Sequence, residues 1–260
     1  SAPAPVDPDE LASEVVLAPL PEEADVPAWT PMIPEVGERE LRRALAQARD
    51  AEAAGRLFTL PVQAPVGAAD EAAADAGQGE APDAGPGDAD TTEEPRPGAV
   101  EWLLAVQEAD PDNAEAAAAL ARVLAELQRQ GRIALTEGRF VDAERAERVV
   151  ARAQPQHPDL AAYRESLAAA RRAQEAVRLA EARARANRIL RPEGEGAVAA
   201  YREALQAFPD YLPARDGLAR LQARHLDRAL AAAQGGEYLE AERLQAEAGR
   251  ILPDSPALQD

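Results

Sequence analysis

The stretch Gly138–Pro155, GRFVDAERAERVVARAQP, has a counterpart at Gly236–Pro253, GEYLEAERLQAEAGRILP. Each begins with glycine, has an aromatic residue two positions on and an alanine five positions on, and ends with proline. An alanine followed twelve positions later by proline occurs four times, at Ala99–Pro111, Ala143–Pro155, Ala197–Pro209 and Ala241–Pro253. The prolines are 44, 54 and 44 residues apart (155−111, 209−155, 253−209). A period in this range is typical of stacked helical pairs.

Apolar periodicity and the proline positions together predict the helices. We expect one helix over 38–54, long helices over 114–137, 159–190 and 214–234, and short helices over 99–109, 141–154, 197–208 and 239–252. The prolines after residue 98 all fall between these helices, because proline lacks the N–H that a helix interior needs. The ten extra residues of the third unit are assigned to the helix ending at Leu190 and to the turn 191–196. The prediction is an all-α protein, an α-solenoid of about four antiparallel helix pairs.

The composition points to a thin core and to acidic segments outside the repeats. Hydrophobic residues make up 46% of the chain but aromatic residues only 3%, so the core depends on alanine and close helix approach. Of the net charge of −19, residues 1–40 carry −9 and residues 61–98 carry −8. We predict a disordered acidic Pro-rich tether over 1–37 and a repeat domain over 38–260, interrupted by a flexible acidic insertion over 61–98. The cluster Val26–Trp29 is expected to dock on the chain's own body.

The residue types present exclude several functions. A strongly acidic chain is a poor partner for nucleic acid or an anionic membrane, and no apolar run approaches the roughly 18 residues that insertion into a bilayer needs. Cysteine is absent and neither His157 nor His225 has a second ligand at metal-binding spacing. We therefore expect a non-enzymatic protein with no catalytic, cofactor or metal site, and a packing or surface role for both histidines.

The repeats resemble tetratricopeptide repeats, although their period of about 44 residues is longer than the usual 34. The resemblance is carried by the glycine, aromatic residue, small residue and closing proline of each unit, and by a small residue where two helices cross. The residues concerned are Gly131, Gly138, Phe140, Ala143, Pro155, Ala197, Pro209, Gly236, Tyr238, Ala241 and Pro253. The third repeat lacks the glycine–aromatic turn.

The resemblance implies a concave face, lined by the first helices, that binds a protein or peptide. By register, its candidate residues are Gln128, Arg132, Leu135, Leu226, Leu230 and Gln234. A second candidate is the arginine run Arg171, Arg172, Arg178, Arg183, Arg185, Arg188 and Arg191. It is either an ion-paired solvated face or a basic patch for an acidic peptide, which could be the chain's own 61–98 segment.

We consider two functions, one implied by this resemblance and one suggested by the acidic Pro-rich start of the chain. The first is a protein-binding scaffold, and the alternative is a rigid spacer or accessory segment of a larger membrane-anchored envelope protein. The Pro-rich acidic start followed by GRLF is similar to extracytoplasmic segments of bacterial envelope proteins. This similarity implies a periplasmic location, with the cytoplasm as the alternative. The identity of the partner and the oligomeric state stay open.

Overall fold

The computed structural model describes residues 29–59 and 96–253. This part of the chain is helical and contains no strand, which confirms the all-α prediction. A short 3-10 helix, Glu38–Glu40, leads into the first α-helix. The α-helices are α1 (Leu41–Ala53), α2 (Ala99–Ala109), α3 (Ala114–Glu137), α4 (Phe140–Ala153), α5 (Leu160–Arg185), α6 (Ala197–Ala207), α7 (Leu212–Gln234) and α8 (Tyr238–Ile251).

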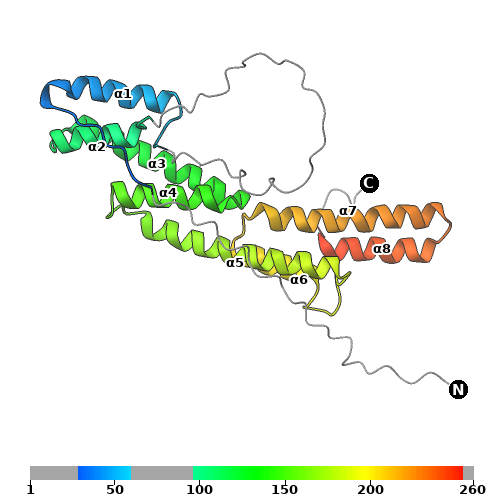
Figure 1. The fold of residues 1–260 in the computed structure, drawn as a ribbon. Coiled ribbons are helices and arrows are strands. Elements are labelled where there is room, and N and C mark those ends of the chain that lie inside the picture. The colour runs from blue at the N-terminus through cyan, green and yellow to red at the C-terminus, as the bar shows by residue number, and fades with distance from the viewer. Residues whose placement is uncertain (1–28, 60–95, 254–260) are drawn as a thin grey trace, which may run out of the picture. The chain divides into compact units, whose positions relative to one another are not determined.

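The described residues fall into two compact units. Unit 1 comprises residues 128–147 and 156–253, and unit 2 comprises residues 29–59, 96–127 and 148–155. In unit 1, α5 packs on α6, α7 packs on α8, and α7 also contacts α5 and α6. In unit 2, α1 packs on α2. Figure 1 shows α1 beside α2, and α7 beside α8 as a helical hairpin. The solenoid arrangement as a whole stays a prediction.

Four first helices end in the same hydrogen-bonded turn. After α1, α3, α5 and α7 one residue has positive φ, and these residues are Gly55 (74°), Gly138 (77°), Asn187 (57°) and Gly236 (81°). At α3, the N–H of Gly138 donates to the carbonyl of Leu135, and the N–H of Arg139 donates to that of Ala134. The same pair of bonds closes the other three helices. This is the Schellman pattern, in which a left-handed residue satisfies the last helical carbonyls and reverses the chain.

Asn187 corrects the predicted third repeat. The helix expected over 159–190 ends at Arg185, because Asn187 takes the left-handed conformation that glycine takes elsewhere. Asparagine tolerates this conformation better than most residues. The ten extra residues therefore divide equally: five precede the turn (32 from Pro155 to Asn187 against 27 from Pro111 to Gly138) and five follow it (22 from Asn187 to Pro209 against 17 from Gly138 to Pro155).

The other repeat-defining residues occupy the places that the pattern implies. Ala99, Ala143 and Ala197 have no exposed surface, and Ala241 is half-buried. Pro155, Pro209 and Pro253 each follow the last residue of a short helix by two positions. Phe140 packs against the buried core of unit 1, whereas Tyr238 at the equivalent position is 69% exposed.

Unit 2 closes the base of the long insertion with a buried carboxylate. Glu101 of α2 has no exposed surface, and its Oε1 accepts a hydrogen bond from the N–H of Thr59 (2.8 Å). Its Oε2 accepts a bond from the N–H of Gly98 (3.1 Å). Thr59 and Gly98 lie on either side of residues 60–95, so one side chain holds the two ends of that segment together. The predicted insertion over 61–98 otherwise lies outside the described residues, apart from 96–98.

The segment before α1 also packs on unit 2. Trp29 is 8% exposed, and its ring meets that of Phe58 edge to face with the centroids 6.4 Å apart. This contact agrees with the expected docking of the cluster Val26–Trp29 on the chain's own body, and the tether over 1–37 stays a prediction. Residues 1–28 lie outside the described part of the chain.

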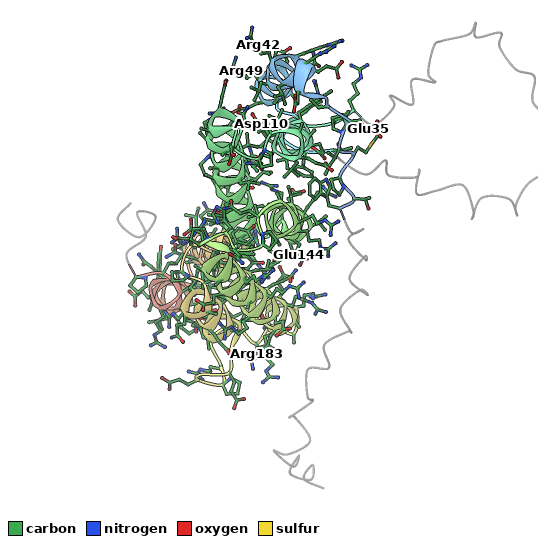
Figure 2. All side chains as sticks on the ribbon, turned by 90° about the vertical axis from the view of Figure 1, so that its left-hand side faces the viewer. Glu35, Arg42, Arg49, Asp110, Glu144 and Arg183 are labelled. Carbon is green, nitrogen blue, oxygen red and sulfur yellow. The ribbon has the colours of Figure 1, made fainter. Side chains whose placement is uncertain are left out.

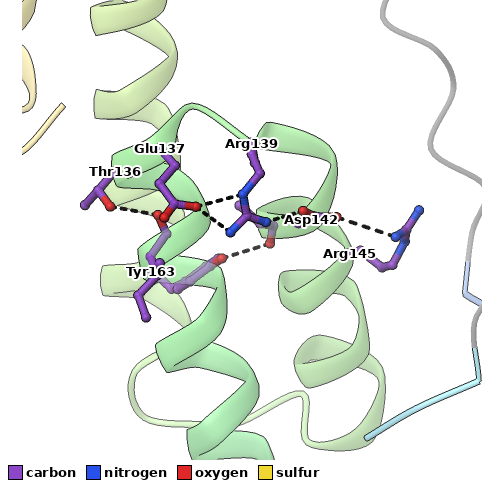
Figure 3. Close-up of polar contacts among 8 residues, drawn as sticks. Thr136, Glu137, Arg139, Asp142, Arg145 and Tyr163 are labelled. Atoms are coloured by element: carbon purple, nitrogen blue, oxygen red, sulfur yellow. Dashed lines mark hydrogen bonds and ion pairs between the residues drawn. The ribbon is translucent and has the colours of Figure 1, made fainter. Parts of the chain in front are cut away.

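Gly131 lies at a close contact between helices of unit 1. A Cβ at this position would lie 2.1 Å from the hydroxyl oxygen of Tyr163 and 3.1 Å from the Cβ of Ala146. Tyr163 is 1% exposed, and its hydroxyl donates to the carbonyl of Ala143 (2.8 Å), as Figure 3 shows. Glycine at residue 131 therefore makes the room that lets the tyrosine of α5 reach the first turn of α4.

The first prediction concerns Glu101. Glu101→Gln places an amide N–H₂ against one of two backbone donors, so we expect unit 2 to lose about 1–3 kcal/mol of unfolding free energy. Both tryptophans, Trp29 and Trp102, lie in unit 2, so tryptophan fluorescence during urea unfolding follows this unit. The control is Glu108→Gln at an exposed position of the same helix. Equal midpoints for the two variants would contradict the closing role of Glu101.

The second prediction concerns Gly131. Gly131→Ala forces Tyr163 to move, and we expect a loss of about 1–3 kcal/mol from overpacking, measured by urea unfolding followed by circular dichroism. Because the nearest atom is a hydroxyl oxygen, the same substitution in a Tyr163→Phe background should cost less. Strictly additive losses in this double-mutant cycle would show that the two residues do not compete for the same space.

Candidate functional site

Unit 1 has a hollow of about 500 Å³ between α5, α6 and α7. The residues that line it come from one face of α5, one residue of α6 and one face of α7. They are Glu181, Ala184, Arg185, Tyr201, Gly217, Arg220, Leu221 and Arg224. The spacings i, i+3, i+4 on α5 and i, i+3, i+4, i+7 on α7 place each set on a single side of its helix.

A tyrosine forms the floor of the hollow. Tyr201 is 3% exposed, and a Cβ at Gly217 would lie 2.3 Å from its Cε1 atom. Gly217 therefore has the role toward Tyr201 that Gly131 has toward Tyr163. Leu221, 4% exposed, adds the apolar part of the wall. The floor is thus fixed by close packing rather than by a mobile side chain.

Arginines form the rim of the hollow. Arg185, Arg220 and Arg224 are exposed, and Glu181 is the carboxylate among the lining residues. The guanidinium of Arg220 lies near the hydroxyl of Tyr201 and lowers its pKa. Arg185 donates from Nε to the backbone carbonyl of Glu181 (3.4 Å). Within residues 29–59 and 96–253, none of the three arginines forms an ion pair with a carboxylate.

Other arginines of the chain are held by carboxylates. Arg139 pairs with Glu137 (2.6 Å) and with Asp142, as Figure 3 shows. Arg243 of α8 pairs with Glu240 (2.5 Å) and Glu247 (2.6 Å). Not every exposed arginine is so engaged: Arg42 of α1 projects from the ribbon in Figure 2 and forms no ion pair with the described residues. The hollow differs because three arginines without a carboxylate partner in the described residues, Arg185, Arg220 and Arg224, line it together.

Burial sets the ionisation of the floor. Desolvation raises the pKa of the Tyr201 hydroxyl, and the negative charge of Glu181 raises it further. Arg220 lowers it by a smaller amount. The hydroxyl therefore stays protonated at neutral pH, and the positive charge of the rim is not cancelled by a phenolate.

The residues predicted for a concave groove do not form one site. Leu135 has no exposed surface and lies in the core with Tyr163, and Gln128 is 5% exposed, so neither faces a groove. The physical reason is that α3 packs its inner face against α4 and α5, and the register chosen from sequence selects that face. Leu226 is half-buried, while Arg132, Leu230 and Gln234 are exposed. None of the six lines the hollow.

Some arginines of the run 171–191 fit the predicted ion-paired face, and one fits the predicted basic patch. Arg171 pairs with Glu144 (2.5 Å), Arg188 with Glu195 (3.8 Å), and Arg183 donates to the carbonyl of Gly196 (3.4 Å). These contacts fit the ion-paired face. Arg185 instead lines the hollow with two arginines of α7 that the sequence reading did not select. The spacing of Gly217, Arg220 and Arg224, which places them on one face of a helix, could have indicated this site from the sequence.

Both histidines have structural contacts. His157 Nδ1 accepts hydrogen bonds from Gln128 Nε2 (3.2 Å) and from the N–H of Asp159 (3.2 Å). His225 Nδ1 donates to the carbonyl of Leu221 (2.8 Å). In the described part of the chain no three His, Asp or Glu side chains gather to hold a metal ion.

Comparisons of the chain with protein-family models, with curated proteins and with solved structures found no match. The resemblance to tetratricopeptide repeats therefore rests on the residues quoted above and stays a prediction.

The third prediction follows from Tyr201. Its pKa is higher in the folded than in the unfolded chain, where it is about 10, so burial of the neutral phenol contributes stability that is fully present below pH 10. This contribution falls as the pH rises above that value. Unfolding free energy measured by urea and circular dichroism should therefore depend less on pH above 10 in Tyr201→Phe than in the unaltered protein. Parallel pH curves for the two proteins would contradict this assignment.

Proposed function

We propose that the chain is a non-enzymatic protein-binding scaffold whose hollow in unit 1 receives an acidic segment of a partner polypeptide. The observation that carries the proposal is the convergence of Arg185, Arg220 and Arg224 on one hollow without a carboxylate partner in the described residues. The guanidinium group binds carboxylates through two parallel hydrogen bonds, which favours acidic side chains as ligands.

The surroundings of the rim favour a peptide over a larger polyanion. The hollow carries three cations against one carboxylate, but the whole chain has a net charge of −19. A nucleic acid would meet repulsion from the acidic segments 1–40 and 61–98, which carry −17 of this charge, whereas a short acidic segment needs only the local field. Leu221 and the ring of Tyr201 offer apolar contact beside the charges, which suits a peptide that mixes acidic and apolar residues.

The position of Arg220 supports its role as the central contact. Arg220 lies near the hydroxyl of the buried Tyr201, at the centre of the lining face of α7, where a bound carboxylate would also meet the apolar wall of the hollow. Arg224 lies one helical turn further along the same face of α7. The two guanidinium groups can therefore bind carboxylates that are spaced along one strand or helix of the ligand.

The proposal also includes the location implied by the sequence, the envelope of a bacterium. The structure adds that no helix among the described residues has the length and apolar character to cross a membrane.

The fourth prediction tests the hollow with a fluorescein-labelled 12-residue peptide of alternating glutamate and leucine. Arg220→Glu combined with Arg224→Glu should weaken its binding to the full chain by about tenfold or more, because two attractive contacts become repulsive. Binding to the unaltered protein should also weaken with added salt. Fluorescence anisotropy gives the dissociation constants, and circular dichroism checks that helicity is retained.

The matched control is Arg42→Glu combined with Arg43→Glu on the exposed face of α1 in unit 2. It changes the net charge by the same amount and should leave the affinity within about twofold. Equal weakening by both double variants would mean that overall charge, not the hollow, governs binding. No binding by the unaltered protein would reject the hollow as an acidic-peptide site and favour the spacer function.

A further inference from the structure

The two tight glycine–aromatic turns of unit 1 are equivalent in sequence and backbone. Gly138 and Gly236 have φ of 77° and 81°, and each is followed two positions later by an aromatic residue. Phe140 corresponds to Tyr238, and Val141 corresponds to Leu239. The hydrogen bonds that close α3 and α7 also match one for one. The two turns therefore present the same kind of surface, and their surroundings can be compared directly.

The first turn is covered by the start of α7. A Cβ at Gly138 would lie 3.1 Å from the hydroxyl oxygen of Tyr211 and 3.3 Å from Cγ of Pro213. The rings of Phe140 and Tyr211 have their centroids 6.5 Å apart, and Phe208 packs on the other side of Tyr211 at 6.3 Å. Tyr211 is 2% exposed. The element that fits such a turn is thus a helix start that carries a tyrosine and, two residues later, a proline.

The second turn has no such cover in the described part of the chain. No atom lies within 4 Å of a Cβ built at Gly236. Tyr238 is 69% exposed, Leu239 is 84% exposed, and Leu230 on the adjacent turn of α7 is 60% exposed. Even the repeat alanine is affected, because Ala241 is half-buried where Ala143 has no exposed surface. Three large apolar side chains at this hairpin tip are therefore exposed to more than half of their surface, more than Val141 (46%), the residue equivalent to Leu239 at the covered turn.

We propose that the α7–α8 tip, formed by Leu230, Gly236, Tyr238 and Leu239, binds the start of an α-helix of another polypeptide, a partner protein different from this chain. By the internal template, that helix start carries an aromatic residue followed two positions later by proline. The aromatic ring packs on Tyr238 as Tyr211 packs on Phe140, and proline lies over Gly236, where the absence of a Cβ leaves room for it. This surface is separate from the arginine hollow, since none of its four residues lines the hollow.

The fifth prediction supplies the template as a separate molecule. The probe is a fluorescein-labelled peptide with the sequence of residues 206–223, held helical by a lactam between Asp216 and a lysine substituted for Arg220. Circular dichroism verifies its helicity before use. We expect the full chain to bind it, and Tyr238→Ser combined with Leu239→Ser to weaken binding by about tenfold or more. Replacing Tyr211 by serine in the peptide should have a similar effect.

Val141→Ser is the matched control, because it alters the equivalent residue at the turn that the chain's own Tyr211 already covers. It should leave the affinity for the peptide unchanged. Failure of the helical peptide to bind, or equal binding by the Tyr238/Leu239 double variant, would overturn the proposal.

Sedimentation adds an independent check: a dimer that the double variant dissociates would show that a second copy occupies the tip. Tighter peptide binding after removal of residues 254–260 would show that the chain's own end covers it, and either result would overturn the assignment to another polypeptide.

Discussion

One left-handed residue at the end of each first helix is the constraint on which the rest of the structure depends. A residue with positive φ at 55, 138, 187 and 236 satisfies the last carbonyls of a long helix and reverses the chain within two residues. The reversal brings the next helix back against the first, and the alanine that follows is small enough for close approach. Without this reversal the alanine-rich helices would bury too little apolar area to remain packed.

The same turn explains why very different loops are accommodated. In the first and third repeats the backbone forms two further hydrogen bonds before the second helix: Ala99 and Val100 donate to Arg56 and Leu57, while Ala197 and Val198 donate to Arg188 and Ile189. A loop that starts after Leu57 or Ile189 has its two ends already joined by these hydrogen bonds. The connections 58–98 and 190–196, which hold the extra residues, lie at this one equivalent place. Because closing a longer loop adds little entropic cost once its ends are fixed, the helix pair is preserved in both repeats.

The sequence predicted the helices well and the surfaces poorly, for a physical reason. Proline and glycine act locally, so α2 and α3 have the predicted bounds, α4 and α8 differ by one residue at each end, and α6 differs by one residue at its C-terminal end. Asn187 was missed because asparagine only occasionally adopts the left-handed conformation. The groove residues failed differently: Leu135 and Gln128 lie on the side of α3 that meets neighbouring helices, and a helix of 24 residues has more than one packed face. Arg220 and Arg224 depend on the contact of α7 with α5, which no local pattern contains.

Departures from the repeat, rather than the repeat itself, locate the two proposed surfaces. Residues that hold a helix pair together are buried and bonded within the chain, as the hydrogen bond from the Tyr163 hydroxyl to the Ala143 carbonyl illustrates. Where a repeat keeps such a side chain but lacks the residues that cover it in another repeat, the side chain is exposed and can contact a partner. The turn at Gly236 keeps the glycine and the aromatic residue but lacks the helix start that covers Gly138. Within the described residues, Arg220 and Arg224 of α7 likewise have no carboxylate partner of the kind that holds Arg139 and Arg243. In a protein built from repeated helix pairs, such unmatched positions are where a partner can add stability that the chain's own packing does not supply.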